Sequence, residues 1–239
     1  LATLAAYRRR GIPPEALRLL SQLVCVSKTG AKTEEAKLDF AIREVLNPRA
    51  PRVLAVLDPL KVVLTNYPEG ESEEIDAPYF PHDVPREGSR PVPFGRDLWI
   101  ERSDFEEHPP KGFRRLVPGG EVRLRYAYVI RCDEVVKSPS GEIVELRCTY
   151  DAATRSGASP EGRKTKGTIH WVSAAHALEA EVRLFGRMFL DYDDEAEVAE
   201  DGGVTAAPLN PESLTVLRHV RVEPSVGRDA PDTRYQFER

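Results

Sequence analysis

The sequence predicts a mainly β fold with an all-helical segment at its N-terminus. Residues 1–47 carry helical patterns, whereas from Arg52 onward short runs of β-branched and aromatic residues are separated by Pro, Gly, Asn and Asp. Many short strands with no helix between them are typical of a β-sandwich or β-barrel. The chain has 239 residues and is 41% apolar, which is enough for one large domain or two small ones with buried cores.

Two helices are predicted in the N-terminal segment. Pro14 and Glu15 open the first, because Pro fits the first turn of a helix and leucines follow at helical spacing. Thr33 is the predicted N-cap of the second helix, and Asn47–Pro48 ends it. The apolar face of this second helix consists of Leu38, Ile42 and Val45.

Strands are predicted from Arg52 to the C-terminal region. Besides the stretch described next, they are expected in RVLAVLDP, LKVVLTNYP, RDLWIERSDF, EIVELRCTY, GTIHWVSA, AEVRLFGRMF and LTVLRHVRVE. Each run is short, rich in β-branched or aromatic residues and bounded by turn formers, which favours strands over helices.

The stretch EVRLRYAYVIRCDEV, residues 121–135, alternates as a half-buried strand does. Its predicted inner face consists of Val122, Leu124, Tyr126, Tyr128, Ile130 and Cys132, and its outer face carries Arg123, Arg125 and Arg131. Guanidinium groups spaced two residues apart, about 6.5–7 Å, suit unstacked bases or consecutive phosphates. The alternative is a face charged for solubility, with cross-strand partners such as Glu142 and Glu145.

A hairpin is predicted at KSPSG, residues 137–141, because these are turn-forming residues between two strand-like runs. A turn centred there places Cys132 opposite Cys148 on the apolar face. Disulfides between adjacent strands are strained, so the pair is predicted to be two reduced core thiols. The chain has three cysteines and no CxxC spacing, which fits a reducing, cytoplasmic location.

Basic residues are concentrated in one region although the net charge is -5. Between Lys111 and Arg131 there are six basic residues and one acid, Glu121. Acidic residues gather in EGESEE, residues 69–74, and DYDDEAEVAED, residues 191–201, both predicted to be solvated loops. Where the charges lie matters more for nucleic-acid binding than their sum.

No catalytic or metal site is predicted. The sequence contains no phosphate-binding loop of the GxxxxGK[ST] type and no GxSxG element, and its five histidines lack metal-ligand spacing. SKTG, residues 27–30, is interpreted as a connection between helices. No run approaches the roughly 18 apolar residues of a membrane helix, and the N-terminus is not a signal peptide. Recognition of a binding partner is therefore the class of function that the sequence favours.

Six segments follow one another along the chain in an order that is highly specific. They are APRVLAVLDPLKVVLTNYPEG, VPFGRDLWIERSDF, FRRLVPGGEVRLRYAYVIRCDEVVKSPSGEIVELRCTYD, KTKGTIHWVSAAHALEAEVRLFGRMF, LNPESL and YQFER. Together they strongly resemble the C-terminal half of the bacterial glutaminyl-tRNA synthetase family. YRRRGIPPEALRLLSQL is similar to the helical subdomain of that family, so the resemblance covers essentially the whole chain.

The resemblance implies a helical subdomain and two β-barrels that grip the tRNA anticodon loop, related to a barrel with which some ribosomal proteins bind RNA. Residues 1–47 are expected to form the helical subdomain and 101–175 the distal barrel. The proximal barrel is expected from 48–100 and 176–239, incomplete at its C-terminal end.

The resemblance also implies roles for individual residues. The residues expected to bind the anticodon are Arg52, Arg114, Arg115, Arg123, Arg125, Gln236 and Arg239. By similarity, Arg52 of APR and the Gln and Arg of QFER bind the middle base. Arg115 engages the third base, with Arg114 near the backbone, and the RLR arginines are associated with the first base. Gly112 stands where relatives often carry a polar side chain.

The function implied is anticodon recognition within a glutamine–tRNA ligase, whose catalytic motifs are absent from this segment. The expected partners are glutamine tRNA and, at the catalytic domain of the full-length enzyme, glutamine and ATP with magnesium. No cofactor, DNA or membrane is expected for the segment itself. The alternatives are a eukaryote-type glutamyl-tRNA synthetase, a standalone RNA-binding barrel, and a structural barrel whose arginines form only intramolecular salt bridges.

Overall fold

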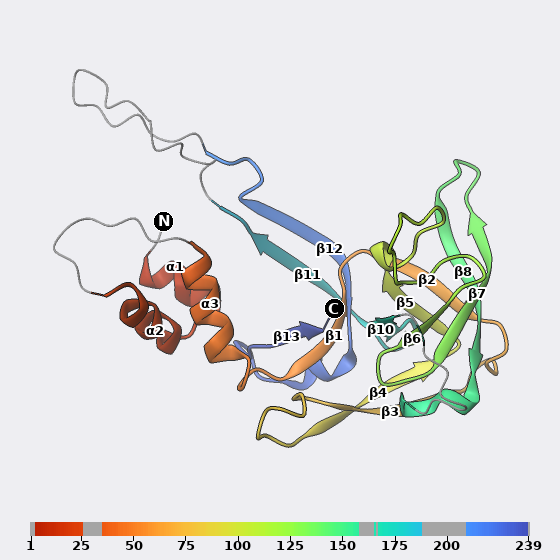
Figure 1. Ribbon diagram of the computed structural model, residues 1–239, viewed down its shortest axis with the longest axis horizontal. Helices are drawn as coiled ribbons and strands as arrows, with labels where there is room; N and C mark the ends of the chain where they lie inside the picture. The colour runs from red at the N-terminus through yellow and green to blue at the C-terminus, as the bar shows by residue number, and fades with distance from the viewer. Residues whose placement is uncertain (1–2, 26–34, 158–164, 166, 188–208, 239) are drawn as a thin grey trace.

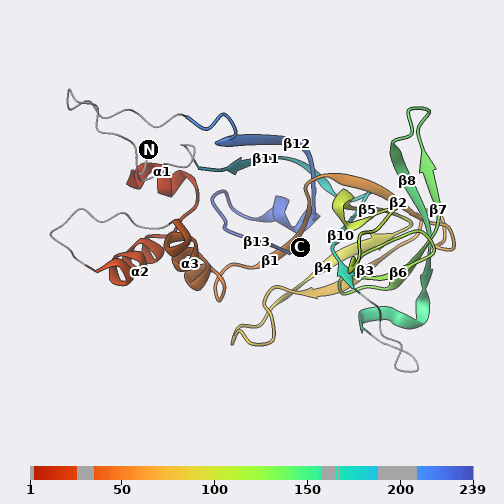
Figure 2. The same ribbon diagram turned by 45° about the horizontal axis from the view of Figure 1, so that its top comes forward.

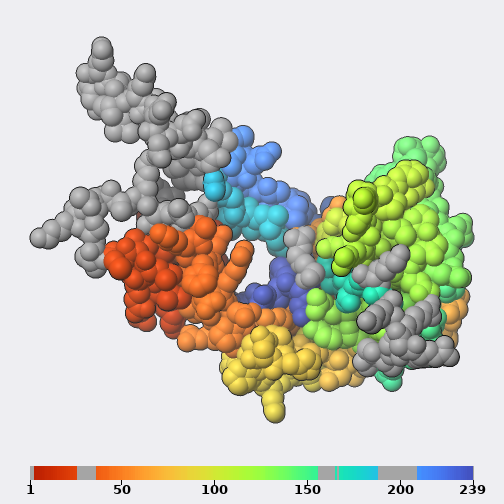
Figure 3. Space-filling model, in the orientation of Figure 1, coloured from red at the N-terminus to blue at the C-terminus, as the bar shows by residue number. Residues whose placement is uncertain are grey.

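The chain forms a helical region, a central four-stranded sheet and a barrel-like sheet, arranged in that order along the long axis of the molecule (Figures 1 and 3). The computed structural model describes residues 3–25, 35–157, 165, 167–187 and 209–238. The fold is mainly β with helices at the N-terminus, as the sequence predicts.

Three helices lie at one end of the molecule: α1 (Leu4–Arg9), α2 (Pro14–Val24) and α3 (Glu35–Leu46). Pro14 opens α2 as predicted, since a first-turn Pro has no N–H to leave unpaired. Leu38, Ile42 and Val45 of α3 are all half-buried, which confirms the predicted face. Thr33 and residues 27–30 lie outside the described residues.

Seven strands curl into a nearly closed barrel. Their order is β10 (Trp171–Ser173), β5 (Asp97–Glu101), β2 (Pro59–Leu64), β8 (Ile143–Asp151), β7 (Val129–Lys137), β6 (Glu121–Leu124) and β9 (Thr168–Ile169). The edge strands β9 and β10 follow one another in the chain with only His170 between them. The seam of the barrel therefore lies at His170, whose side chain is 1% exposed.

The central sheet joins four strands that are far apart in the sequence. Its order is β11 (Leu178–Phe185), β12 (Leu214–Val222), β1 (Arg52–Val56) and β13 (Gln236–Glu238). β13 runs parallel to β1 and places Gln236 opposite Arg52. The β11–β12 pair extends away from the barrel toward the helical region (Figure 2).

A separate two-stranded ribbon, β3 (Ser72–Pro78) and β4 (Ser89–Gly95), packs against the barrel. Phe94 of β4 is fully buried, with ring centroids 5.1 Å from Tyr128 and 5.1 Å from Trp171 of the barrel. The contact with Trp171 is edge-to-face and that with Tyr128 is tilted, and such aromatic contacts add to the stabilisation from burial alone. Short 3-10 helices follow three strands: η1 (Arg102–Asp104), η2 (Ala152–Gly157) and η4 (Pro224–Arg228).

The structure corrects two expectations about local conformation. Residues 121–135 do not form one strand: β6 ends at Leu124 and the chain turns back into β7 at Val129. The inner face was nevertheless predicted well, because Val122, Leu124, Ile130 and Cys132 are buried on both strands. The acidic stretch 69–74 is also not wholly a loop, since Ser72 begins β3. Residues 191–201 lie outside the described residues.

The hairpin joining β7 to β8 confirms the predicted turn and places Cys132 opposite Cys148. Both thiols are free and fully buried. The sheets cut across the ranges expected for the two barrels, because β2 and β5 pair within the seven-stranded sheet while β1 lies in the four-stranded one. The division at residues 100 and 176 stays a prediction.

Candidate nucleic-acid interface

A cavity of about 390 Å3 lies where the start of β1, the strand β13, the end of β3 and the β6–β7 turn meet. It is lined by Arg52, Pro78, Phe80, Pro81, His82, Arg125, Tyr126, Gln236, Phe237 and Glu238. Three of these, Arg52, Arg125 and Gln236, were predicted as site residues from separate segments of the sequence. The fold therefore brings three of the seven predicted residues to one place.

Arg52 is held on one wall of the cavity by its backbone and one side-chain nitrogen. Its N–H donates to the carbonyl of Tyr79 at 2.9 Å, and Nη2 donates to Oδ1 of Asn47 at 2.7 Å. Nη1 is buried and has no hydrogen-bond partner among the described residues. Gln236 lies opposite Arg52 in the parallel pairing, and each is the first residue of its strand, so both stand at the same end of the β1–β13 pair.

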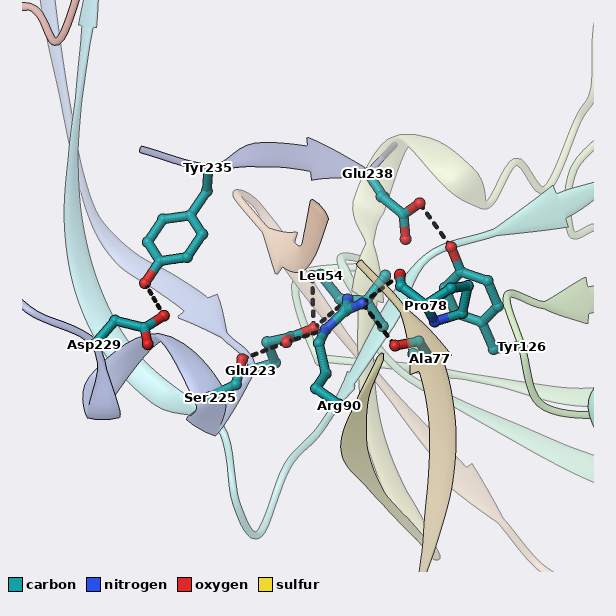
Figure 4. A network of polar contacts seen from close by, with 10 residues as sticks. All are labelled: Leu54, Ala77, Pro78, Arg90, Tyr126, Glu223, Ser225, Asp229, Tyr235 and Glu238. Carbon is teal, nitrogen blue, oxygen red and sulfur yellow. Dashed lines mark hydrogen bonds and ion pairs between the residues drawn. The ribbon is translucent and has the colours of Figure 1, made fainter. Parts of the chain in front are cut away.

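The opposite wall is the tight turn that connects β6 to β7. Tyr126 has a positive φ of 66°, a conformation that L-residues other than Gly rarely adopt. The turn lets the Tyr126 hydroxyl donate to Oε1 of Glu238 at 2.7 Å (Figure 4). Burial and this hydrogen bond raise the pKa of Tyr126 to about 12, so it stays a neutral donor.

Arg125 contributes the second guanidinium group of the cavity. Its Nη1 lies 3.7 Å from Oε1 of Glu238, and its Nε is buried without a hydrogen-bond partner in the described part of the chain. Oε2 of Glu238 is likewise buried and unpartnered there. Buried polar atoms are normally hydrogen-bonded, so unpaired ones in residues that line a cavity point to a ligand or water there.

The arrangement suits a flat ligand that both donates and accepts hydrogen bonds. Two guanidinium groups offer donors, the Glu238 carboxylate offers an acceptor, and Phe80, Tyr126 and Phe237 supply aromatic surface. Proteins read unstacked nucleobases with this combination of guanidinium planes, aromatic rings and polar edges.

Arg114, Arg115 and Arg123 form a second basic group, beside the β6–β9 edge and outside the cavity. The backbone of Arg123 donates to the carbonyl of Gly167 at 3.0 Å, and a Cβ on Gly167 would lie 2.0 Å from the carbonyl oxygen of Arg114. The Arg123 side chain donates to the carbonyl of Thr154 at 2.8 Å, while Arg115 pairs with Asp104. Arg114 is exposed.

The predicted residues are thus divided between two places. Arg123 and Arg125 do not share one strand face, because β6 ends between them and Arg125 turns toward Glu238. Arg239 lies outside the described residues. The pairs Arg115–Asp104 and Arg125–Glu238 are intramolecular ion pairs of the kind that a purely structural barrel would also contain.

Sequence reasoning missed seven of the ten residues that line the cavity: Pro78, Phe80, Pro81, His82, Tyr126, Phe237 and Glu238. Tyr126 was assigned to the apolar face of a strand because the sequence after Leu124 contains no Gly, Pro or Asn, the residues that would predict a turn there. Phe237 and Glu238 stand inside the QFER motif, so their proximity to Gln236 was an available signal. Nothing in the sequence pattern marks Phe80.

A buried ion pair supports the wall that carries Pro78. Arg90 of β4 donates to the carbonyl oxygens of Ala77 and Pro78 at 3.2 and 2.8 Å, and to Glu223 through Nε and Nη2. Glu223 in turn accepts from the N–H of Leu54 in β1 at 2.8 Å (Figure 4). The pair ties the end of β3 to β1, and thus Pro78 to the strand that begins at Arg52.

The described residues contain no group of three or more His, Cys, Asp or Glu side chains placed to hold a metal ion. None of the described helices has the length and apolar character needed to cross a membrane.

Comparison with known proteins identifies the family. A family described as "tRNA synthetases class I (E and Q), anti-codon binding domain" matches residues 50–151, and a second of the same description matches 168–239. This chain belongs to the class I (E and Q) tRNA synthetases. Both sheets and the cavity between them therefore fall within the parts of the synthetase family described as anticodon-binding.

Similar proteins carry the name glutamine–tRNA ligase. The chain is 53% identical over its whole length to the one from Nitrobacter hamburgensis, of which it covers 41%. It is 50% identical over its whole length to the one from Ectopseudomonas mendocina and 49% to the one from Pseudomonas aeruginosa, covering 42% of each. The chain thus spans about two-fifths of the length of these synthetase relatives.

Proposed function

We propose that this chain recognises the anticodon of glutamine tRNA as part of a glutamine–tRNA ligase. The observation that carries the proposal is the cavity, which unites Arg52, Arg125 and Gln236 from three separate segments. Its volume of about 390 Å3 lies within the range of about 300–1,000 Å3 typical of small-ligand sites. In this proposal it holds one anticodon base that has left the stack.

The chemistry of a base fits the unpaired atoms of the cavity. Carbonyl oxygens of a base accept from Arg52 Nη1 and Arg125 Nε, and a ring N–H donates to Oε2 of Glu238. Arg239 belongs to the proposed site by resemblance, as the last residue of QFER. Arg114, Arg115 and Arg123 act outside the cavity, where the exposed residues Arg114 and Arg115 contact neighbouring bases or phosphates.

The proposal for the whole enzyme rests on the names of the relatives. A glutamine–tRNA ligase joins glutamine to tRNA with ATP and magnesium, and in our proposal that chemistry belongs to a catalytic part other than this chain. The proposed location is the cytoplasm. The family description covers both E and Q, so a glutamyl-tRNA synthetase is the second candidate; a comparison of the two tRNAs as binding partners distinguishes them.

Binding of labelled tRNA at one fixed salt concentration tests the proposal. The protein is mixed with glutamine tRNA and with a version whose middle anticodon base is changed, because phosphate contacts alone are insensitive to sequence and strongly salt-dependent. The changed tRNA is expected to bind more weakly by about 1–3 kcal/mol. Arg52→Ala is expected to remove that difference.

Arg147→Ala is the matched control. Arg147 lies on β8, is half-exposed and pairs with Glu134 and Glu145, so it is another ion-paired arginine that does not line the cavity. Its loss should leave the preference for the correct anticodon intact. Equal binding of the two tRNAs by the unchanged protein would overturn the proposal and leave the ion-paired arginines with a structural role only.

A further inference from the structure

Three buried polar side chains form a row that starts at Arg115 and includes His170, the residue at the seam of the barrel. Arg115 Nη1 contacts Oδ1 of Asp104, and the other oxygen of Asp104 lies 3.6 Å from Nδ1 of His170. The second ring nitrogen of His170, Nε2, lies 3.6 Å from Oε2 of Glu101. The side chains of Asp104, His170 and Glu101 are 0%, 1% and 5% exposed, whereas that of Arg115 is 48% exposed.

Different elements bring these residues together. Glu101 ends β5, Asp104 belongs to η1, and His170 is the residue between β9 and β10. Glu101 also accepts the N–H groups of Leu57 and Asp58, each at 2.9 Å, in the turn that joins β1 to β2. The row therefore connects the loop that carries Arg115 with the end of the strand that carries Arg52.

The charges in this row depend on one another. Burial alone would raise the pKa of Glu101, but the adjacent His170 ring and the hydrogen bonds from the N–H groups of Leu57 and Asp58 lower it below the ordinary value, so Glu101 is ionised. The two carboxylates lie on either side of the His170 ring, each with one oxygen 3.6 Å from a ring nitrogen, and the Arg115 guanidinium group contacts the Asp104 carboxylate. Buried charges are tolerated when they are paired in this way.

The row leaves most of the Arg115 guanidinium group available. Within the described residues, Asp104 is the acidic partner of Arg115, and the contact uses one of its terminal nitrogens. A guanidinium group has five N–H donors in a rigid fork, and the Arg115 side chain is 48% exposed, so donors remain for a partner. An anchored fork loses less conformational entropy on binding than a free side chain does.

We propose that Asp104 and His170 are positioning residues that hold the Arg115 guanidinium group ready to contact the anticodon loop. Asp104 fixes the group directly. His170 holds the Asp104 carboxylate in place and is itself held by Glu101, as an outer partner orients the ligand of a binding site. This inference rests on the proposed function, and it adds two buried residues to the recognition of tRNA.

The preference for the correct base at each anticodon position shows whether Asp104 and His170 position Arg115 or only support the barrel. Affinity is measured for glutamine tRNA and for versions altered at each of the three anticodon positions, with unchanged protein, Arg115→Ala, Asp104→Asn and His170→Gln. Arg115→Ala identifies the position that Arg115 reads. Asp104→Asn is expected to lower discrimination about tenfold at that same position and to preserve it at the position that depends on Arg52.

A double-mutant cycle gives the second readout. If Asp104 acts through Arg115, Asp104→Asn changes discrimination no further once Arg115 is Ala, because effects within one contact are not additive. His170→Gln is expected to give a smaller loss at the same position. It also serves as the deciding variant if Asp104→Asn fails to fold, as judged by its thermal unfolding.

The outcomes separate the two proposals. If Arg115→Ala changes discrimination but neither Asp104→Asn nor His170→Gln does, the positioning role is overturned and the proposed function stands. A uniform loss at all three positions would show damage to the barrel and overturn the positioning role as well. If the unchanged protein discriminates at no position, the proposed function fails together with this inference.

Discussion

Arg90 and Glu223 form an ion pair with two parallel hydrogen bonds in the interior of the protein. Nε of Arg90 lies 2.5 Å from Oε1 of Glu223, Nη2 lies 2.8 Å from Oε2, and each side chain is 1% exposed. Glu223 also accepts from Leu54 and from the hydroxyl of Ser225, so its oxygens are fully used. The pair joins the β3–β4 ribbon to the central sheet.

Glu223→Gln is expected to lower the free energy of unfolding by about 3–5 kcal/mol. The amide keeps the shape of the carboxylate but leaves the Arg90 guanidinium group buried without a counter-charge. Urea unfolding followed by circular dichroism measures the change. The control is Glu134→Gln, which breaks the pair with Arg147 on β8, where the side chains are 57% and 47% exposed. That exposed pair should cost less than about 1 kcal/mol.

The three cysteines are expected to react with a thiol reagent in two classes. Cys25 is exposed, whereas Cys132 and Cys148 are buried and free. The contact with Cys132 and burial raise the pKa of the Cys148 thiol, so the reactive thiolate is disfavoured. Ellman's reagent should therefore titrate one thiol in the native protein and three in denaturant. Cys25→Ser should remove the fast reaction, and fewer than three thiols in denaturant would reveal a disulfide.

The sequence predicted those features of the fold that follow from local patterns. The helix starting at Pro14 and the register of Cys132 with Cys148 depend on nearby residues, and both are confirmed. The alternation of residues 121–135 correctly assigned most of the buried side chains. It missed the turn at Tyr126 because a reversal between β6 and β7 keeps the same residues facing the core.

Long-range relationships could not be predicted from local patterns. Arg90 and Glu223 are far apart in the sequence, and the residues around each of them do not predict that it is buried in an ion pair. The same holds for Tyr126 and Glu238, which meet only because β13 pairs with β1. The resemblance to the synthetase family selected Arg52 and Gln236, and the structure places them side by side.

Tyr126→Phe is expected to destabilise the protein by an amount that depends on pH. The hydrogen bond to Glu238 stabilises the fold by about 1–2 kcal/mol while the phenol is neutral. The pKa of Tyr126 is raised from 10.0 to about 12 in the fold. The stabilisation is thus fully present below pH 10 and is lost as the pH rises through about 12.

The difference in unfolding free energy between the unchanged protein and Tyr126→Phe, measured from pH 7 upward, tests this dependence. Taking the difference cancels the titration of the other tyrosines. Tyr7→Phe in α1, away from the cavity, is the control and should show no comparable dependence. A difference that stays constant to pH 12 would contradict the assignment of the hydrogen bond.

Gly167→Ala is expected to displace the loop that carries Arg114 and Arg115. An added Cβ would lie 2.0 Å from the carbonyl oxygen of Arg114, which is backbone and cannot rotate away. The loop must move from the β9 edge, at an expected cost of about 1–3 kcal/mol in unfolding free energy. Affinity for tRNA should fall as well, because the guanidinium group of Arg115 moves with the loop.

Gly95→Ala is the control for this steric argument. There the added Cβ would lie 3.3 Å from the carbonyl oxygen of Glu71, so a shift of a few tenths of an ångström relieves the contact. The expected loss of unfolding free energy is below about 1 kcal/mol. The affinity for tRNA should not change, because Gly95 belongs to the β3–β4 ribbon, which contacts the barrel through Phe94 and does not carry Arg115. Urea unfolding and tRNA titration of both variants compare the two sites. Equal costs at both positions would show that the close approach of Gly167 to Arg114 does not hold the loop.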